Sequence, residues 1–336
     1  MSADGGTWAH GDDAAGRVWE PGGPLDLSAT IGPLAHGPRD PAFQVTPDGA
    51  HWWASWTPDG PGTVRIARGS TGSDPHRPVI AQAWGTGAAW LLDGVPELLG
   101  ARDDRRGFEP TAHPLVAELD HRFPGLRVTR TRRVFEAAVA AVLGQKVTGR
   151  EAFDSWQVLV RRHGTPAPGP EPVREVGRGA GTRPALVVPP SPATWRRLAQ
   201  HDLLAANVTP ERARTLRAVV VVAESLERTV VDGRAFGDVD RALQSVPGIG
   251  PWTSAEIRQR AHGDADAVSV GDFHLANDVC WALTGERGDD AQMLRLMQPW
   301  LGHRYRIQRL LEVGHVSAPR RGPRYSPPAH RRLPGA

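Results

Sequence analysis

The sequence predicts an α+β protein in which a small antiparallel sheet-and-helix domain precedes an all-helical core. Short β-prone segments alternate with turns rich in proline, glycine and aspartate between residues 25 and 84. Beyond residue 108, apolar residues instead recur at the spacing of amphipathic helices. At 336 residues, the chain is long enough for more than one small domain and a substantial core.

Residues 21–107 are expected to form the amino-terminal α+β domain. Residues 1–20 are polar with scattered glycine and are expected to be disordered. Residues 86–99 predict helical pieces that pack on the sheet. The predicted strands are residues 43–45, 51–56, 63–67 and 79–84. The tryptophans expected in the core of this domain are Trp52, Trp53, Trp56, Trp84 and Trp90.

Residues 108–315 are expected to form the helical core. Apolar residues in 134–142 and again in 153–159 follow helical spacing, which buries one face of two successive helices. Residues 164–191 are rich in proline and glycine and predict a flexible insertion, whose apolar end at residues 185–188 is a candidate for docking. Residues 316–336 form a basic tail. The other predicted helices are residues 114–123, 195–203, 210–226, 239–243, 252–260, 273–283, 291–297 and 304–311.

The residues between two of these helices predict a turn that binds an anion. Gly248 and Gly250 let the backbone turn sharply and bring its N–H groups close to a ligand at a helix N-terminus. Ile249 between them is expected to pack between the two helices, and Pro251 suits a first helical turn. Because a G-x-G is also typical of a plain helix-turn-helix corner, the turn alone leaves both readings open.

Longer strings decide between these readings. The string VPGIGPWTS at residues 246–254 resembles the helix-hairpin-helix of the base-excision DNA glycosylases, and GDFHL at residues 271–275 resembles the catalytic-aspartate segment of that superfamily. LGQKVT at residues 143–148 resembles a segment of the bacterial inducible 3-methyladenine DNA glycosylases, as does the Pro-Trp pair at residues 299–300. The resemblance implies a two-lobed helical glycosylase core behind a small sheet-and-helix domain, with the active cleft between the lobes.

Asp272 is the catalytic candidate in this resemblance. Cleavage of an N-glycosidic bond builds positive charge on the sugar, which a nearby carboxylate stabilises while it orients or activates water. Asp272 also stands just before a predicted helix, where aspartate is a common N-cap. The two roles are compatible.

The resemblance also assigns residues to the damaged base and to DNA. It implies that Trp252, Phe273 and Trp300 stack on a flipped-out base and that Gln145 supports this site. For Trp300, packing in the core is the alternative. Lys146 stands where relatives commonly place an apolar wedge, so a wedge, a phosphate or orphan-base contact, and a solvated turn all stay open. The residues expected to bind DNA are Pro247, Gly248, Ile249, Gly250, Thr253 and Lys146.

Two residue types that occur once limit the chemistry. Lys146 is the single lysine, and Trp252 stands near the hairpin where strand-nicking relatives carry an amine, so base removal without lyase activity is expected. The single cysteine, Cys280, is expected in a buried helix and excludes both an internal disulfide and a four-cysteine iron–sulfur cluster. We therefore expect no cofactor, with a monovalent cation at the hairpin left as an alternative.

The resemblance implies a monofunctional glycosylase for alkylated purines of the 3-methyladenine and 7-methylguanine type. Its expected partner is double-stranded DNA with damaged bases, along which the basic tail lies if it is not disordered. A monomer in the cytoplasm, associated with the nucleoid and not with a membrane, is expected. The alternatives are a glycosylase for oxidised or mismatched bases and a non-catalytic, structure-sensing DNA-binding protein. Asp272 favours an enzyme over the latter, because a carboxylate near the DNA backbone would only repel phosphate.

Overall fold

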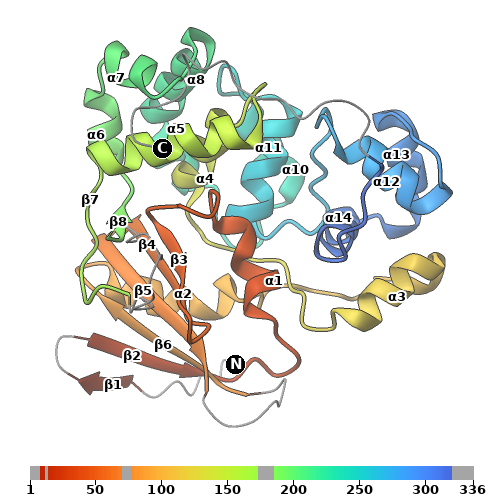
Figure 1. Ribbon diagram of the computed structural model, residues 1–336, viewed down its shortest axis with the longest axis horizontal. Helices are drawn as coiled ribbons and strands as arrows, with labels where there is room; N and C mark the ends of the chain where they lie inside the picture. The colour runs from red at the N-terminus through yellow and green to blue at the C-terminus, as the bar shows by residue number, and fades with distance from the viewer. Residues whose placement is uncertain (1–7, 12–13, 70–76, 173–184, 320–336) are drawn as a thin grey trace, which may run out of the picture.

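The amino-terminal part of the computed structural model is an antiparallel sheet. The structure describes residues 8–11, 14–69, 77–172 and 185–319. Within this part of the chain the strand order is β1-β2-β6-β5-β4-β3 (Figure 1). All four predicted strands are present, so the predicted antiparallel sheet is confirmed. The strands are β1 (Trp8–Gly11), β2 (Ala14–Trp19), β3 (Phe43–Val45), β4 (His51–Thr57), β5 (Gly60–Arg68) and β6 (Val79–Trp84).

Helices cover one face of this sheet. Side chains alternate between the two faces along each strand, so Trp53 of β4 and Val64, its partner on β5, lie on the same face. Both are buried in one cluster with apolar residues of two helices and with Leu25, which precedes the first of these helices. The helical packing predicted for residues 86–99 is therefore confirmed. The helices are α1 (Leu27–Ile31), which continues into the 3₁₀ turn η1 (Gly32–Leu34), and α2 (Ala88–Leu98).

The opposite face is covered by the two ends of the segment predicted to be a flexible insertion. Trp52 and Trp84 stack with their ring centroids 5.4 Å apart, and Leu186 is buried in the same cluster. The prediction of a flexible segment is wrong for residues 164–172, and the docking considered for residues 185–188 is confirmed, because apolar side chains at both ends bury tryptophan surface. Residues 173–184 lie outside the described residues. The segment contributes the paired strands β7 (Thr165–Pro166) and β8 (Val187–Val188).

The prediction of a disordered amino-terminus is wrong for β2. This strand pairs with β6 over residues 15–19. Arg17, which is 8% exposed, also donates to the carbonyl oxygens of Leu92 and Asp93 in α2. The small and polar residues of β2 do not show the alternation of apolar and polar residues that predicts a strand. The strand is held instead by its backbone hydrogen bonds to β6 and by Arg17, whose acceptors are far along the chain. Residues 1–7 lie outside the described residues.

A first group of helices surrounds α4. Eight of the ten residues of α4 are buried, as expected of a helix that is apolar on every side. The group shares one core, to which the hairpin residues Val246 and Ile249 also belong. Its helices are α4 (Val134–Leu143), α5 (Gly149–His163), α6 (Pro192–Arg197), α7 (Gln200–Ala205), α8 (Pro210–Val221), α9 (Ala223–Glu227), α10 (Phe236–Gln244), α11 (Pro251–Ile257) and the π-helical turn η3 (Arg258–His262).

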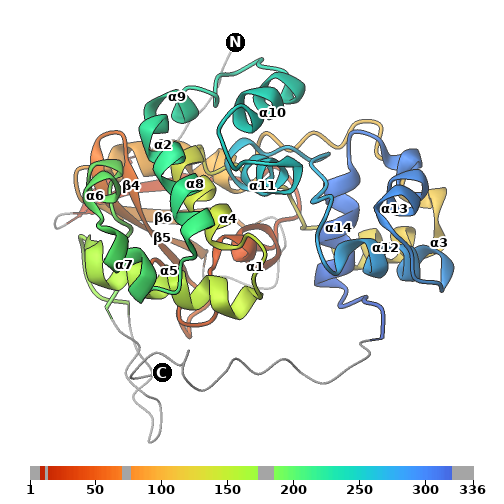
Figure 2. The same ribbon diagram turned by 90° about the horizontal axis from the view of Figure 1, so that it is seen from above.

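A second group of helices has its own core, in which Val116, Met293 and Ile307 are fully buried. It includes α3, which precedes α4 in the sequence but lies beside the carboxy-terminal helices (Figures 1 and 2). The chain therefore crosses between the two groups in residues 123–133 and again in residues 263–274. The elements are η2 (Pro110–Ala112), α3 (Pro114–Arg122), α12 (Leu275–Thr284), α13 (Asp290–Leu296), η4 (Gln298–Trp300) and α14 (Arg304–Val313).

The helices differ from the prediction in three places. The helix expected at residues 210–226 is divided at Val222 into α8 and α9. The helix expected at residues 195–203 is split, because the backbone at Leu198 is extended, with ψ at 125°. The helix expected at residues 252–260 ends at Ile257 and continues as the π-helical turn. Among the described helices, none has both the length and the apolar composition needed to cross a bilayer.

Candidate active site

The hairpin between α10 and α11 has the sharp turn that its glycines predict. Gly248 adopts a φ of +89°, which favours glycine, and a Cβ there would lie 2.1 Å from Oγ1 of Thr215. Gly250 has an extended backbone, with φ at −99°, and a Cβ there would meet nothing within 4 Å. Gly248 is therefore required by the fold, whereas Gly250 leaves open space at the N-terminus of α11.

Ile249 fixes the hairpin to the helices on either side. Its side chain is 5% exposed and packs in the same core as Leu243 and Val246. In the described part of the chain, no protein acceptor takes the backbone N–H groups of Gly248 and Gly250. Free N–H groups at a helix N-terminus suit an anion such as a phosphate. Binding of DNA phosphate by these residues, including Pro247, stays a prediction.

Gly248→Ala is expected to destabilise the hairpin. A positive φ costs alanine about 1–3 kcal/mol, and its Cβ would overlap Thr215. Thermal unfolding should therefore begin at a lower temperature than in the unaltered protein and in Gly250→Ala, the matched control. Affinity for DNA, measured by fluorescence anisotropy, should fall on every duplex alike, because a backbone contact reads no sequence. A loss confined to one sequence or lesion would mean that the hairpin touches bases.

Gln145, at the end of α4, supports the hairpin directly. Its Nε2 donates to the carbonyl oxygen of Gly248 and to Oγ1 of Thr253, each over 2.9 Å. The hydroxyl of Thr253, a residue that is 3% exposed, is buried against Gln145, and its predicted contact with DNA stays a prediction. The neighbouring Lys146 is exposed and has a φ of 54°. The only lysine of the chain thus lies beside the hairpin, and its wedge, phosphate and solvent roles all stay predictions.

Asp272 binds the start of α12 with one oxygen of its carboxylate. Oδ1 accepts from the backbone N–H groups of His274 at 2.8 Å and of Leu275 at 2.9 Å. In the described part of the chain, Oδ2 accepts from no protein donor. The N-cap of α12 is His274, so the prediction of Asp272 as the N-cap of a helix from residue 273 is wrong by two residues. Oδ1 still accepts from the free N–H groups at the start of α12, and the other carboxylate oxygen is left for another partner.

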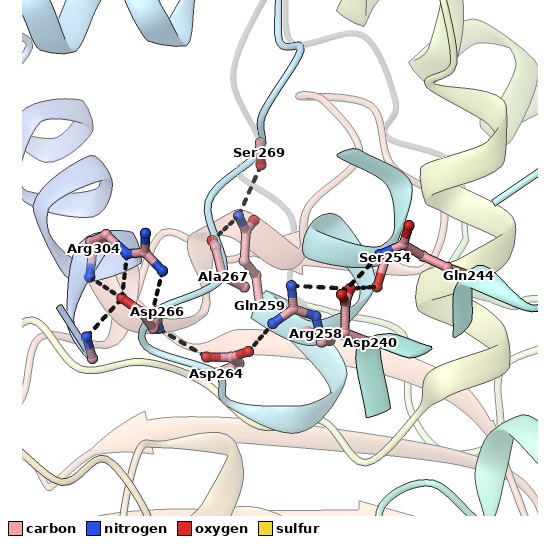
Figure 3. A network of polar contacts seen from close by, with 11 residues as sticks. Asp240, Gln244, Ser254, Arg258, Gln259, Asp264, Asp266, Ala267, Ser269 and Arg304 are labelled. Atoms are coloured by element: carbon pink, nitrogen blue, oxygen red, sulfur yellow. Dashed lines mark hydrogen bonds and ion pairs between the residues drawn. The ribbon is translucent and has the colours of Figure 1, made fainter. Parts of the chain in front are cut away.

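The loop that carries Asp272 is tied to the helix that leaves the hairpin. Nε2 of Gln259, in η3, donates to the carbonyl oxygen of Ala267 at 2.8 Å and to Oγ of Ser269 at 2.9 Å (Figure 3). The carbonyl oxygen of Ser269 in turn accepts from the N–H of Asp272 at 3.1 Å. Gln259 and Ser269 are each 1% exposed, so both bonds are buried. The spacing between the hairpin and Asp272 is thereby fixed.

A chain of ion pairs holds the first half of the same loop. Arg258 bridges Asp264 and Asp240, the latter on α10, and Asp266 pairs with Arg304 at the start of α14 (Figure 3). Burial raises the pKa of the Asp264 carboxyl, and the Arg258 guanidinium opposes this rise. The hydrogen bond to Asp266 raises the pKa of Arg304. These pairs link both helix groups through the loop, so the position of Asp272 depends on each of them.

The three aromatic residues predicted for the base site have different surroundings. Phe273 is 85% exposed. Trp252 is half-buried, and a Cβ at Gly144 would lie 3.2 Å from its ring, so the ring lies against the end of α4. Trp300 is 2% exposed, and its Nε1 donates to the carbonyl oxygen of Glu109 at 2.8 Å. Its prediction as a base-stacking residue is therefore wrong, because the ring is enclosed in the core of its helix group.

Three residues of this site were not predicted from the sequence: Glu256, Gln259 and Ser269. Gln259 lies between buried apolar residues, Ile257 and Ala261. Its direct neighbours are Arg258 and Arg260, so no apolar stretch marks it in the sequence; once buried, its amide needs a polar partner. The sequence does not say that this partner is the loop before Asp272.

Comparison with solved structures identifies the fold. The 3-methyladenine DNA-glycosylase from Archaeoglobus fulgidus superposes with a TM-score of 0.69, covering 88% of this chain and 97% of its own at 16% identity. The chain has the fold of the helix-hairpin-helix DNA glycosylases. Its similarity extends to the 8-oxoguanine glycosylase/lyase of Clostridium acetobutylicum, at a TM-score of 0.62 and 13% identity, over 93% of this chain and 99% of that one. The resemblance predicted from the motifs is thus confirmed at the level of fold.

Sequence comparison adds a narrower match. The chain is 29% identical over 184 residues, or 55% of its length, to a "Probable bifunctional transcriptional activator/DNA repair enzyme AlkA" from Mycobacterium tuberculosis. This match spans about a third of the relative, 33% of its length. No protein-family model matches the chain. Among the described residues, no group of His, Cys, Asp and Glu side chains could hold a metal ion.

Proposed function

We propose that this protein is a base-excision repair DNA glycosylase, which hydrolyses the N-glycosidic bond of flipped-out alkylated purines in double-stranded DNA and leaves the strand intact. The connection between the hairpin and Asp272 carries this proposal. Gln259 follows the hairpin helix and holds Ser269, whose carbonyl oxygen accepts from Asp272. A turn suited to backbone phosphate and a carboxylate suited to the sugar are thus parts of one unit.

Asp272 would stabilise the charge that develops when the base leaves. Its Oδ1 is occupied by two backbone N–H groups, which fix the orientation of the carboxylate. Its Oδ2 is then the atom that faces the sugar, where it stabilises the oxocarbenium-like transition state and orients water. A single carboxylate suffices for a cationic alkylated purine, because such a base needs no proton in order to leave.

Phe273 and Trp252 would hold the flipped base. The exposed ring of Phe273 directly follows Asp272, and the half-buried ring of Trp252 begins the hairpin helix. Stacking on an aromatic face gains a cationic base about 0.5–2 kcal/mol per ring, depending on desolvation. Neutral bases lack this electrostatic gain, which favours alkylated purines as substrates.

A glycosylase for oxidised bases is the second candidate, and the similarity to an 8-oxoguanine glycosylase/lyase favours it. Trp252, second after Gly250, stands where lyases of this fold carry their amine. Without that amine, the Schiff-base chemistry of a lyase falls to Lys146 or to the amino-terminus. The 3-methyladenine DNA-glycosylase superposes with a higher TM-score than the 8-oxoguanine glycosylase/lyase, 0.69 against 0.62, which favours alkylated purines over oxidised ones.

The product distinguishes these candidates. With a duplex that carries one alkylated purine, we expect release of the base and an abasic strand that breaks only after alkali treatment. Borohydride should trap no protein–DNA adduct, because no imine forms without an amine at the anomeric carbon. Gel electrophoresis of the labelled strand measures both the strand breakage after alkali and the trapped adduct. A parallel duplex with 8-oxoguanine should remain uncut after alkali.

Lys146→Ala and Arg150→Ala form the matched pair for this assay, because each removes one cation from the loop and helix that follow α4. Neither should change the product. A borohydride adduct that disappears only in Lys146→Ala would overturn the monofunctional proposal and make Lys146 the nucleophile. Release of none of the lesion bases would instead overturn the glycosylase proposal itself.

A further inference from the structure

Glu256 lies on the same face of α11 as Trp252. The two residues are four positions apart, so their side chains are neighbours along the helix. The Glu256 side chain is 16% exposed, so it is largely enclosed while part of it still reaches solvent. Because the Trp252 ring lies against Gly144, the adjoining carboxylate is on the side of α11 that carries the predicted base site.

The hydrogen bonds around Glu256 define its chemical state. Oγ of Ser269 donates to Oε1 over 2.5 Å, and a guanidinium nitrogen of Arg260 donates to Oε2 over 2.8 Å. Oγ of Ser269 also accepts from Nε2 of Gln259, so its own proton is free to point at Glu256. Glu256 therefore acts as an acceptor through both oxygens, as an ionised carboxylate does.

The same contacts link this carboxylate to the loop that carries Asp272, the proposed catalytic residue. Ser269 bonds to Glu256 through its hydroxyl and to the N–H of Asp272 through its carbonyl oxygen, over 3.1 Å. Glu256 thus lies between the stacking ring of Trp252 and the loop that ends in Asp272. A base that stacks on Trp252 with its sugar at Asp272 would present an edge to Glu256.

We propose that Glu256 is a specificity-determining residue, which accepts hydrogen bonds from the two N–H donors of a guanine-type base and selects guanine-derived lesions over adenine-derived ones. This inference rests on the proposed glycosylase function and names the substrate class within it. Each carboxylate oxygen has two acceptor positions, and the protein occupies one on each oxygen. One position on each remains for the base.

Guanine and adenine differ at the edge that a flipped base presents. Guanine offers two adjacent donors, N1–H and the N2 amino group, whereas adenine offers the N6 amino donor beside the lone pair of N1. A carboxylate pairs with both donors of guanine but repels the N1 lone pair of adenine. A site built to accept two hydrogen bonds strongly rejects a base that lacks one of them, because its buried acceptor is left unpaired.

Glu256→Gln tests this inference, because an amide offers one acceptor and one donor and so matches adenine. Duplex DNA treated with dimethyl sulfate contains both 7-methylguanine and 3-methyladenine, and chromatography measures the release of each in one reaction. We expect the ratio of 7-methylguanine to 3-methyladenine release to fall about ten-fold or more in Glu256→Gln. Glu118→Gln, at an exposed position of α3, should leave the ratio unchanged.

The ratio separates recognition from folding, because a loss of folded protein lowers both releases equally. An unchanged ratio in Glu256→Gln would overturn the inference and make the carboxylate a purely structural partner of Arg260 and Ser269. The glycosylase proposal would stand in that case, because the protein would still release methylated bases. Calorimetric titration with the free methylated bases needs no excision. Tighter binding of 7-methylguanine that is lost in Glu256→Gln would support the inference even if the protein released no base, and equal binding of the two bases would contradict it.

Discussion

Asp272→Asn is expected to reduce base excision by about 10²- to 10³-fold or more, the range that a lost charge-stabilising group costs in enzymes. The amide carries no negative charge with which to stabilise the oxocarbenium-like state. Affinity for lesion DNA should stay similar or rise, because the substitution removes a negative charge near the phosphate backbone. Single-turnover release of an alkylated purine and anisotropy with the same duplex measure the two effects.

The bonds of Asp272 to the start of α12 make asparagine the informative substitution. Oδ1 accepts two backbone N–H groups at the start of α12, and an asparagine carbonyl oxygen can accept the same bonds. The fold of the loop should therefore survive while the charge is lost. Alanine would remove both and could not separate them.

Asp289→Asn is the matched control, since Oδ1 of Asp289 also accepts a backbone N–H, that of Gln292, at the start of a helix in the same group, α13. This variant should excise alkylated purines at the unaltered rate. Substantial excision by Asp272→Asn would remove the catalytic assignment. An equal loss in Asp289→Asn would trace the effect to the carboxy-terminal helix group instead of to the reacting centre.

Features of the site that depend on local chemistry were predictable from the sequence. The turn at Gly248 follows from the conformational freedom of glycine, and the packing of Ile249 follows from an aliphatic residue between two helices. The bonds of Asp272 to the N–H groups at the start of α12 follow from its position before a helical run, although the N-cap itself is His274. Each of these depends on neighbours within a few residues, which the sequence displays directly.

Features that depend on distant partners were not predictable. Trp300 and Phe273 both matched the pattern of a base-stacking residue, yet one is enclosed in a core and the other is exposed. A hydrophobic pattern indicates that a side chain is buried but not what it packs against. The same limit hid the contact of Gln259 with Ser269 and the packing of Ala167 against the tryptophans of the sheet.

Asp103→Ala is expected to cost about 3–5 kcal/mol of unfolding free energy, the usual result of leaving a buried charge without its partner. Asp103 and Arg306 are 2% and 1% exposed in their side chains. The carboxylate accepts from both terminal nitrogens of the Arg306 guanidinium, at 2.9 and 2.5 Å, and from the N–H of Val128 at 3.0 Å. The pair joins the segment after α2 to α14, so its loss weakens the contact between the amino-terminal domain and the second helix group.

Asp104, the next residue, provides the control for Asp103→Ala. The hydrogen bond from Arg106 lowers the pKa of the Asp104 carboxyl to about 2, but both side chains are exposed, so solvent screens the pair and little net stability is expected from it. Urea unfolding followed by fluorescence should give a much lower midpoint for Asp103→Ala than for Asp104→Ala. Combining Asp103→Leu with Arg306→Met should restore part of the loss, because no buried charge then remains unpaired. Equal midpoints for Asp103→Ala and Asp104→Ala would mean that water reaches Arg306 and that this pair does not hold the two parts together.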